Sequence, residues 1–423
     1  MRRWMTAGLL VLGIVPGAAH ATAPSAEEVL ATYADIAHAA YSDSLTTAKR
    51  LQGAIDALIE APSAGSHAAA KLAWEVARIP YQQTEAFRFG NPIVDEWEGR
   101  VNAWPLDEGL IDYVEAGRYG ESSDENPYYT ANIVANPTLK LGGRTLETPQ
   151  ITAAVIQELH ELDAVEANVT TGYHAIEFLL WGQDLNGTGH GAGARSYTDF
   201  AAGDACTNGN CERRAQYLTV AAELLVADLE EMVANWEADG VARGQLMEAG
   251  DKGGLAMILT GMGSLSYGEL AGERMKLGLL LHDPEEEHDC FADNTHWSHY
   301  YDALGVRNVY RGRYVRIDGS VVEGASVSDL VAASDAGLDT ALSGALDATM
   351  ARMTDIVFAA EAGEAYDQQI GEGNEAGNAR VDAAITALLV QTREIERAVA
   401  ALGLDGLSIE GSDSLDNPAA VFQ

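Results

Sequence analysis

Residues 25–61 read SAEEVLATYADIAHAAYSDSLTTAKRLQGAIDALIEA. The apolar side chains of this run recur at helical spacing, at Val29, Leu30, Tyr33, Ile36, Ala37 and Ala40. Ser25 and Glu28 form the residue pair of a capping box, which predicts that the helix begins directly after Ser25. The run therefore predicts one long amphipathic helix.

The same helical period recurs along most of the chain. The further segments that carry it are residues 66–89, 148–162, 171–181, 211–236, 254–281, 327–360 and 376–402. Strand-like alternation occurs only around residues 309–322, where Arg-Gly-Arg and Asp-Gly-Ser indicate turns or one small hairpin. Long helices with short connections are typical of bundles, so we expect an all-α fold with at most one small β-hairpin.

A weak internal repeat predicts two related bundles. Residues 81–88, YQQTEAFR, and residues 267–274, YGELAGER, both place Tyr and Arg seven positions apart with Glu between them. The two segments lie 186 residues apart, and the same shift aligns Ser25 with Cys211, where another predicted helix begins. We expect pseudo-symmetric bundles at residues 22–205 and 206–423, produced by tandem duplication. Chance similarity between Ala-rich helices is the alternative.

The first residues have the pattern of an export signal. Two Arg precede an apolar run at residues 8–15, and Ala19-His20-Ala21 matches the small-x-small cleavage pattern. The run is too short to span a bilayer. We expect a signal peptide at residues 1–21, a cut after Ala21, and a periplasmic protein with no membrane insertion after cleavage. An uncleaved N-terminal anchor is the alternative.

The charge of the chain excludes some partners. It has 26 Lys and Arg against 64 Asp and Glu, a formal net charge of −38. A surface of this sign does not bind nucleic acid or anionic membranes. Cys206 and Cys211 frame a short polar loop, and an exported chain allows them to form a disulfide. A Cys-x-x-x-x-Cys metal clip is the alternative, although no further Cys or His follows at ligand spacing.

The segment GYHAIE, residues 172–177, carries the first candidate site. His174 and Glu177 lie three positions apart, so they share one face of the helix that this segment opens. An imidazole and a carboxylate one turn apart can bind one cation, as Glu-x-x-His pairs do in metal-binding bundles. The alternative is a hydrogen-bonded polar pair in the core.

A second candidate lies on the helix before Gly90. Its residues follow one seam at spacings of 4, 3, 4 and 3: Trp74, Arg78, Tyr81, Glu85 and Arg88. Burying such charges costs free energy unless they pair with each other or with a ligand. Pro80 should kink this helix. A solvated face with two incidental aromatic residues is the alternative.

Two further segments carry candidate ligands. Asp107 opens a short helix, where a carboxylate can also act as a cap. Residues 285–296, EEEHDCFADNTH, are either a second cluster of carboxylates and imidazoles or an acidic loop, which is the simpler interpretation. The chain contains no HExxH, HxxEH or GxSxG motif, so the usual zinc-peptidase and serine-hydrolase patterns are absent.

Taken together, these segments resemble the imelysin family, whose GxHxxE mark is met by Gly172, His174 and Glu177. The resemblance extends over nearly the whole mature chain, and residues 73–89, 103–108, 268–274 and 287–296 all look like family segments. Within the family the chain is most similar to the iron-regulated protein A branch. The resemblance implies an exported protein of two helical bundles with a site between them, and a link to iron acquisition.

The resemblance implies His174 and Glu177 as metal ligands, to which we add Glu85 and Asp107 from the polar residues described above. Residues expected around this site, or at a second one, are Arg78, Arg88, Glu269, Arg274 and His288. One His with several carboxylates suits a divalent or trivalent ion, iron before zinc.

The first functional hypothesis is an iron-handling protein whose partners are the metal ion and other periplasmic or outer-membrane iron-uptake proteins. A periplasmic zinc metallopeptidase is the second, although no residue stands out as a general base. The third is a non-catalytic module that holds a carboxylate-bearing ligand or a partner protein on its Arg, Glu and Tyr side chains.

Overall fold

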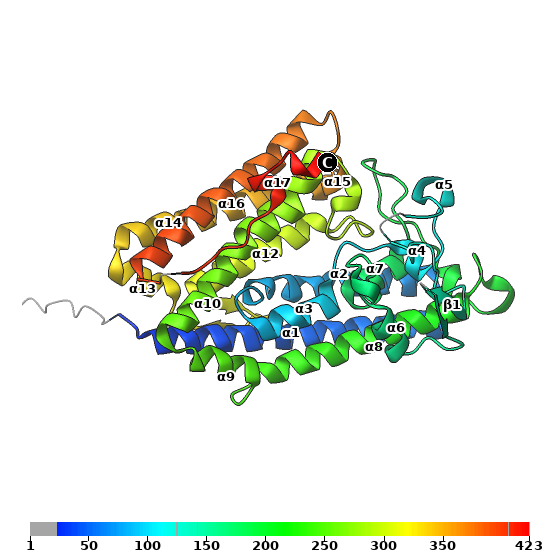
Figure 1. Cartoon of the computed structure of the whole chain (residues 1–423), viewed down its shortest axis with the longest axis horizontal. Coiled ribbons are helices and arrows are strands. Elements are labelled where there is room, and N and C mark those ends of the chain that lie inside the picture. Colours follow the sequence, from blue (N-terminus) through cyan, green and yellow to red (C-terminus); the bar gives the residue numbers. More distant parts are fainter. Residues whose placement is uncertain (1–22, 124–125, 142, 405, 423) are drawn as a thin grey trace, which may run out of the picture.

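The computed structural model describes residues 23–123, 126–141, 143–404 and 406–422. The predicted signal peptide lies outside these residues. Within them almost all regular structure is helical, accompanied by two small two-stranded antiparallel sheets. The all-α prediction is confirmed (Figure 1). No helix of the described residues is long and apolar enough to cross a membrane.

One group of helices is built on the first long helix, α1 (Ala26–Glu60). The predicted capping box is present, since the Ser25 hydroxyl accepts from the Glu28 amide and the Glu28 carboxylate accepts from the Ser25 amide. α1 packs against α2 (Ala64–Gln82) and against α8 (Cys211–Asn235), and α7 (Gly172–Trp181) packs on both α2 and α8. Figure 1 shows α1 and α8 side by side along the lower edge of the molecule.

A second group of helices lies above the first in Figure 1. α14 (Ala336–Glu361) packs against α12 (Thr295–Arg311) and α16 (Glu375–Ala401). α10 (Gly250–Ser264) continues as the π-helical segment η5 (Leu265–Leu277), which packs on α16. α12 also contacts α2, so the two groups meet along these two helices.

The remaining elements are short. The other helices are α3 (Pro92–Asn102), α4 (Glu108–Ile111), α5 (Ala116–Tyr119), α6 (Ala153–Leu159), α9 (Val241–Glu248), α11 (Gly278–Leu281), α13 (Val327–Ser334), α15 (Tyr366–Ile370) and α17 (Asp413–Asp416). The 3₁₀ turns are η1 (Glu85–Phe87), η2 (Leu162–Ala164), η3 (Tyr197–Phe200), η4 (Gly203–Ala205), η6 (Pro284–Glu286) and η7 (Ala420–Phe422).

Two hairpins complete the described secondary structure. β3 (Arg313–Val315) pairs with β4 (Val321–Glu323) where the sequence alternation indicated strands. β1 (Thr138–Leu141) pairs with β2 (Arg144–Glu147), so the structure adds a second hairpin that the alternation did not indicate. Each strand has only three or four residues, which is too short for period-two alternation to stand out.

The helix boundaries differ from the periodicity in physically simple ways. The helix expected at residues 66–89 ends at Gln82, two residues after Pro80, and a 3₁₀ turn follows. The helix expected at residues 327–360 is divided at Asp335, whose carboxylate caps α14 by accepting from the amides of Gly337 and Leu338.

The two predicted bundles share a packed layer, because α8 lies along α1 although it follows residue 206. The division at residue 206 therefore stays a prediction. The two segments of the weak repeat contact each other, since Glu85 of one lies 2.8 Å from Arg274 of the other. Arg88 also lies 3.6 Å from Glu269. Cys206 and Cys211 are joined as a disulfide, and Cys290 is a free thiol.

The start of α7 depends on a glycine. Gly172 has φ +80°, and a Cβ at this position would lie 2.4 Å from the carbonyl oxygen of Val101. α7 therefore lies directly against the backbone of α3, and only glycine meets both the positive φ and the close approach.

We expect Gly172→Ala to lower the free energy of unfolding by about 3 kcal/mol, from the strained backbone plus the clash with Val101. Gly187→Ala is the matched control, because Gly187 has φ +60° but a Cβ added there would meet no atom within 4 Å. The control should lower the free energy of unfolding only by the strain of placing Ala in the left-handed backbone conformation, about 1 kcal/mol. Urea denaturation measures the free energy of unfolding of both variants. Equal losses would show that the close approach to Val101 adds no strain.

Candidate metal centre

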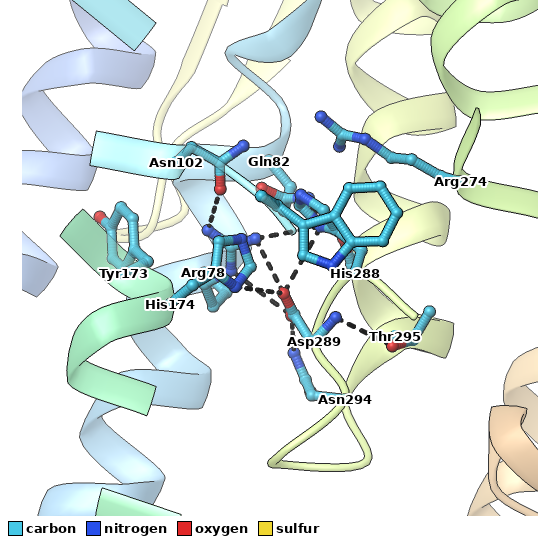
Figure 2. A network of polar contacts seen from close by, with 12 residues as sticks. Arg78, Gln82, Asn102, Tyr173, His174, Arg274, His288, Asp289, Asn294 and Thr295 are labelled. Carbon is cyan, nitrogen blue, oxygen red and sulfur yellow. Dashed lines mark hydrogen bonds and ion pairs between the residues drawn. The ribbon is translucent and has the colours of Figure 1, made fainter. Parts of the chain in front are cut away.

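The candidate site lies where four separate segments meet (Figure 2). α2 supplies Arg78, α3 supplies Asn102, α7 supplies His174, and the loop between η6 and α12 supplies His288 and Asp289. All five residues are buried. Figure 2 shows the side chains of Arg78, His174, His288 and Asp289 gathered around one point.

His174, His288 and Asp289 form the one group of three in the described chain whose ligand atoms already converge closely enough to hold a metal ion. Their ligand atoms all lie within 4.8 Å of one another. The two imidazole rings are 4.7 Å apart between centroids and nearly perpendicular. Neither Nε2 atom has a hydrogen-bond partner, although both side chains are buried. Buried polar atoms are normally satisfied, so this pair of nitrogens calls for an explanation.

Glu177 fixes the orientation of His174. Its Oε2 lies 3.1 Å from His174 Nδ1, and its Oε1 accepts from the amide of Ala292 at 2.9 Å. A carboxylate at Glu177 accepts from Nδ1–H and leaves the Nε2 lone pair of His174 free. Burial raises the pKa of Glu177 well above its usual range, and the charge of Asp289 raises it further. Burial lowers the pKa of His174 well below its usual value.

Arg78 holds Asp289 in place. Its Nη2 donates to Asp289 Oδ1 at 2.9 Å and its Nη1 donates to Asn102 Oδ1 at 2.7 Å. The guanidinium lies 4.9 Å from the ring centroid of Tyr173, in a cation–π contact. Asn294 donates to Asp289 Oδ2 at 2.8 Å. The two buried charges are therefore paired and further hydrogen-bonded, as burial requires.

His288 is held by contacts to its other ring nitrogen. Ser298 Oγ lies 2.8 Å from His288 Nδ1, and Arg78 Nη2 lies 3.3 Å from the same atom. Trp104 donates from Nε1 to the Glu287 carbonyl at 2.9 Å and packs its ring edge-on against His288. Burial lowers the pKa of His288 well below its usual value, so the imidazole stays neutral.

Glu85, expected as a ligand of the His174 ion, lies in a different cluster. Arg274 donates to Glu85 Oε2 at 2.8 Å, to Glu269 Oε1 and to Asp302. Arg88 joins this cluster through Glu269 at 3.6 Å, and it also lies 3.5 Å from Glu98. Burial raises the pKa of Glu98 to about 7. Glu85 and Arg274 are thus buried and paired with each other, while Arg88 is half-buried; the helical spacing alone could not reveal this pairing.

Asp107 is placed at the start of α4, where its Oδ2 accepts from Asn126 Nδ2 at 2.5 Å. It is not part of the His174–His288–Asp289 group. Asp289 was missed at the sequence level, because it lies 115 positions from His174 and the loop interpretation of residues 285–296 gave it no role. The neighbouring His288, an imidazole directly before a carboxylate, was the available signal.

A surface cavity of about 630 Å³ leads to this region. His288, Asn102 and Trp104 line it together with Glu98 and Glu269. Its carboxylates would attract cations from solvent toward His288.

Comparison with known proteins places the chain in a family and identifies similar proteins. The imelysin family model matches residues 37–395. Iron-regulated protein A of Synechococcus elongatus is 39% identical over 64 residues, which are 15% of this chain and only 18% of that relative. The crystal structure of a protein from Parabacteroides distasonis, named as an iron-regulated protein A precursor, is 17% identical with a TM-score of 0.64 and covers 91% of this chain and 97% of that one.

The structural match shows a shared fold, and the 64-residue stretch at 39% identity shows local sequence similarity. The family model spans most of the chain and includes the residues of the buried site. The chain belongs to the imelysin family.

Proposed function

We propose that this protein binds a metal ion, iron before zinc, through His174, His288 and Asp289, and that it serves iron acquisition outside the cytoplasm. The observation that carries the proposal is the buried group of two imidazoles and one carboxylate, whose ligand atoms lie within 4.8 Å of one another and whose histidines each keep an unpartnered Nε2. An ion bound by this group would coordinate one nitrogen of each imidazole and offset the charge of the carboxylate.

The donor set fits iron. Two imidazoles and one carboxylate are the set that non-haem Fe(II) proteins use, with the remaining positions open to water or another ligand. Arg78 supplies one positive charge against the carboxyl groups of Asp289 and Glu177. A bound cation would supply the further positive charge and favour the ionised form of Glu177.

We assign Glu177 the role of orienting His174 through Nδ1 rather than that of a ligand. Both of its oxygens are already engaged, one by His174 and one by the Ala292 amide. The same engagement argues against a peptidase, because a general base needs an oxygen free to reach the attacking water.

The binding-module alternative also loses support. Arg78, Tyr81 and Glu85 of the seam that would recognise an organic ligand are buried, and the charges of Arg78 and Glu85 pair within the chain. Arg88 is half-buried and pairs with Asp95. The link to iron acquisition rests on the names of the two relatives and on the export pattern of residues 1–21. Partners among other iron-uptake proteins follow as part of the same proposal.

We expect His174→Ala and His288→Ala to lose the bound metal. Protein loaded anaerobically with Fe(II) and desalted should carry about one ion per chain, and each variant should fall to background, because each substitution removes one of three ligands. His190→Ala is the control, since His190 is exposed in a loop. Elemental analysis by mass spectrometry gives the content. Parent-like metal content in both variants would rule out the site.

Glu177→Gln should weaken Fe(II) binding by about 10–100-fold without abolishing it, because the residue acts through the hydrogen bond to His174. Competition with a chromophoric chelator measures the affinity. Binding as tight as in the parent would show that Glu177 does not orient His174 for metal binding. No binding at saturating metal would show that Glu177 is a ligand instead.

A further inference from the structure

A second, smaller cavity lies beside the loop that carries His288. It has about 10 Å³ of free space, enough for one water molecule or one ion. Three segments line the cavity. Asp184 follows α7 and Asp367 belongs to α15. The η6 loop supplies Pro284, Glu285, Glu287, Cys290 and Phe291. Neither Lys nor Arg is among these lining residues.

Two of these carboxyl groups are buried without a partner. Glu287 is 1% exposed and Asp367 is 2% exposed. None of their four carboxyl oxygens makes a hydrogen bond. Burial raises the pKa of both groups, and the Thr295 hydroxyl near Glu287 and the Gln368 amide near Asp367 offset only part of that rise, without forming a hydrogen bond of normal geometry. A buried carboxyl group in a folded protein is paired, hydrogen-bonded, protonated or bound to a metal ion. Because both pKa values are raised, protonation is the alternative to a bound cation here.

The surroundings add negative charge to the cavity. Burial raises the pKa of Asp367 to about 7, and the charge of Asp184 adds to that effect. Asp184 is partly exposed and Glu285 is exposed, whereas Glu287 and Asp367 are buried. The four carboxyl groups therefore run from solvent to the interior.

We propose that Glu287 and Asp367 are the inner ligands of a second cation site, for a hard divalent ion of the calcium class, with Asp184 and Glu285 at its mouth. Calcium takes six to eight oxygen ligands in flexible geometry and accepts carboxylates together with water. These oxygens do not converge as closely as the His174 group, so binding draws the outer carboxylates inward. The ion would tie α15 and the segment after α7 to the loop of His288. This site binds a different ion from the iron centre, and the proposal of a calcium-class site does not depend on that centre.

The test compares Ca²⁺ binding and thermal unfolding of the full mature chain. Titration calorimetry of chelator-treated protein should show one Ca²⁺ site, and CaCl₂ should raise the melting temperature. Asp367→Asn should weaken Ca²⁺ binding by at least about tenfold, because it removes one ligand charge. In chelator alone the same variant should melt no lower than the parent, since a repelling charge is gone. This second result separates ligand loss from misfolding.

Three further variants locate the ion. Glu372→Gln removes an exposed carboxyl group near Asp367 and should bind Ca²⁺ as the parent does. His288→Ala should lose iron and keep Ca²⁺, so failure of one site is distinguishable from failure of the other. Cys290→Ser should also keep Ca²⁺, because a hard cation does not need the thiol.

The proposal is overturned if the parent shows neither binding heat nor a rise in melting temperature with Ca²⁺. Parent-like Ca²⁺ affinity in Asp367→Asn would also overturn it. Loss of the Ca²⁺ response in His288→Ala would place the ion at the histidines. A response to Zn²⁺ alone that disappears in Cys290→Ser would replace the hard-cation site with a thiolate site.

Discussion

The buried ion pair between Arg78 and Asp289 is the interaction on which the site depends. It joins α2 to a loop more than 200 positions further along the chain, and neither side chain reaches solvent. Because His288 directly precedes Asp289, the pair positions two members of the metal group at once. Breaking such a pair leaves an uncompensated buried charge, which costs about 3–5 kcal/mol. The loop is therefore fixed before any ion binds.

The charges of this acidic chain fall into three kinds of environment. Most carboxylates lie on the surface, where they keep the protein soluble and attract cations. A second set, Glu85 and Glu269 among them, is buried against Arg88 and Arg274 where the two repeat segments meet. The third set lies beside unpartnered atoms, at His174 and His288 and again at Glu287 and Asp367. This third set has polar atoms left to bind a ligand.

The sequence predicted the parts of the molecule that depend on local spacing. Helical periodicity placed the long helices, and the three-residue interval between His174 and Glu177 placed both on one helix, in contact. Periodicity could not show that α2 ends at Gln82, because backbone hydrogen bonds decide where a helix ends and the side-chain pattern does not report them. Nor could it pair Asp289 with Arg78 or Glu85 with Arg274, since those contacts exist only after the chain folds.

In the proposed iron centre, two imidazoles and one carboxylate bind the same ion. X-ray absorption spectroscopy at the iron edge of the Fe(II)-loaded protein detects these ligands, because imidazole rings give a distinctive outer-shell scattering pattern. We expect scattering from two imidazoles together with oxygen ligands, reduced to one imidazole in His288→Ala if any iron remains. A spectrum fitted by oxygen ligands alone would rule out coordination by the histidines.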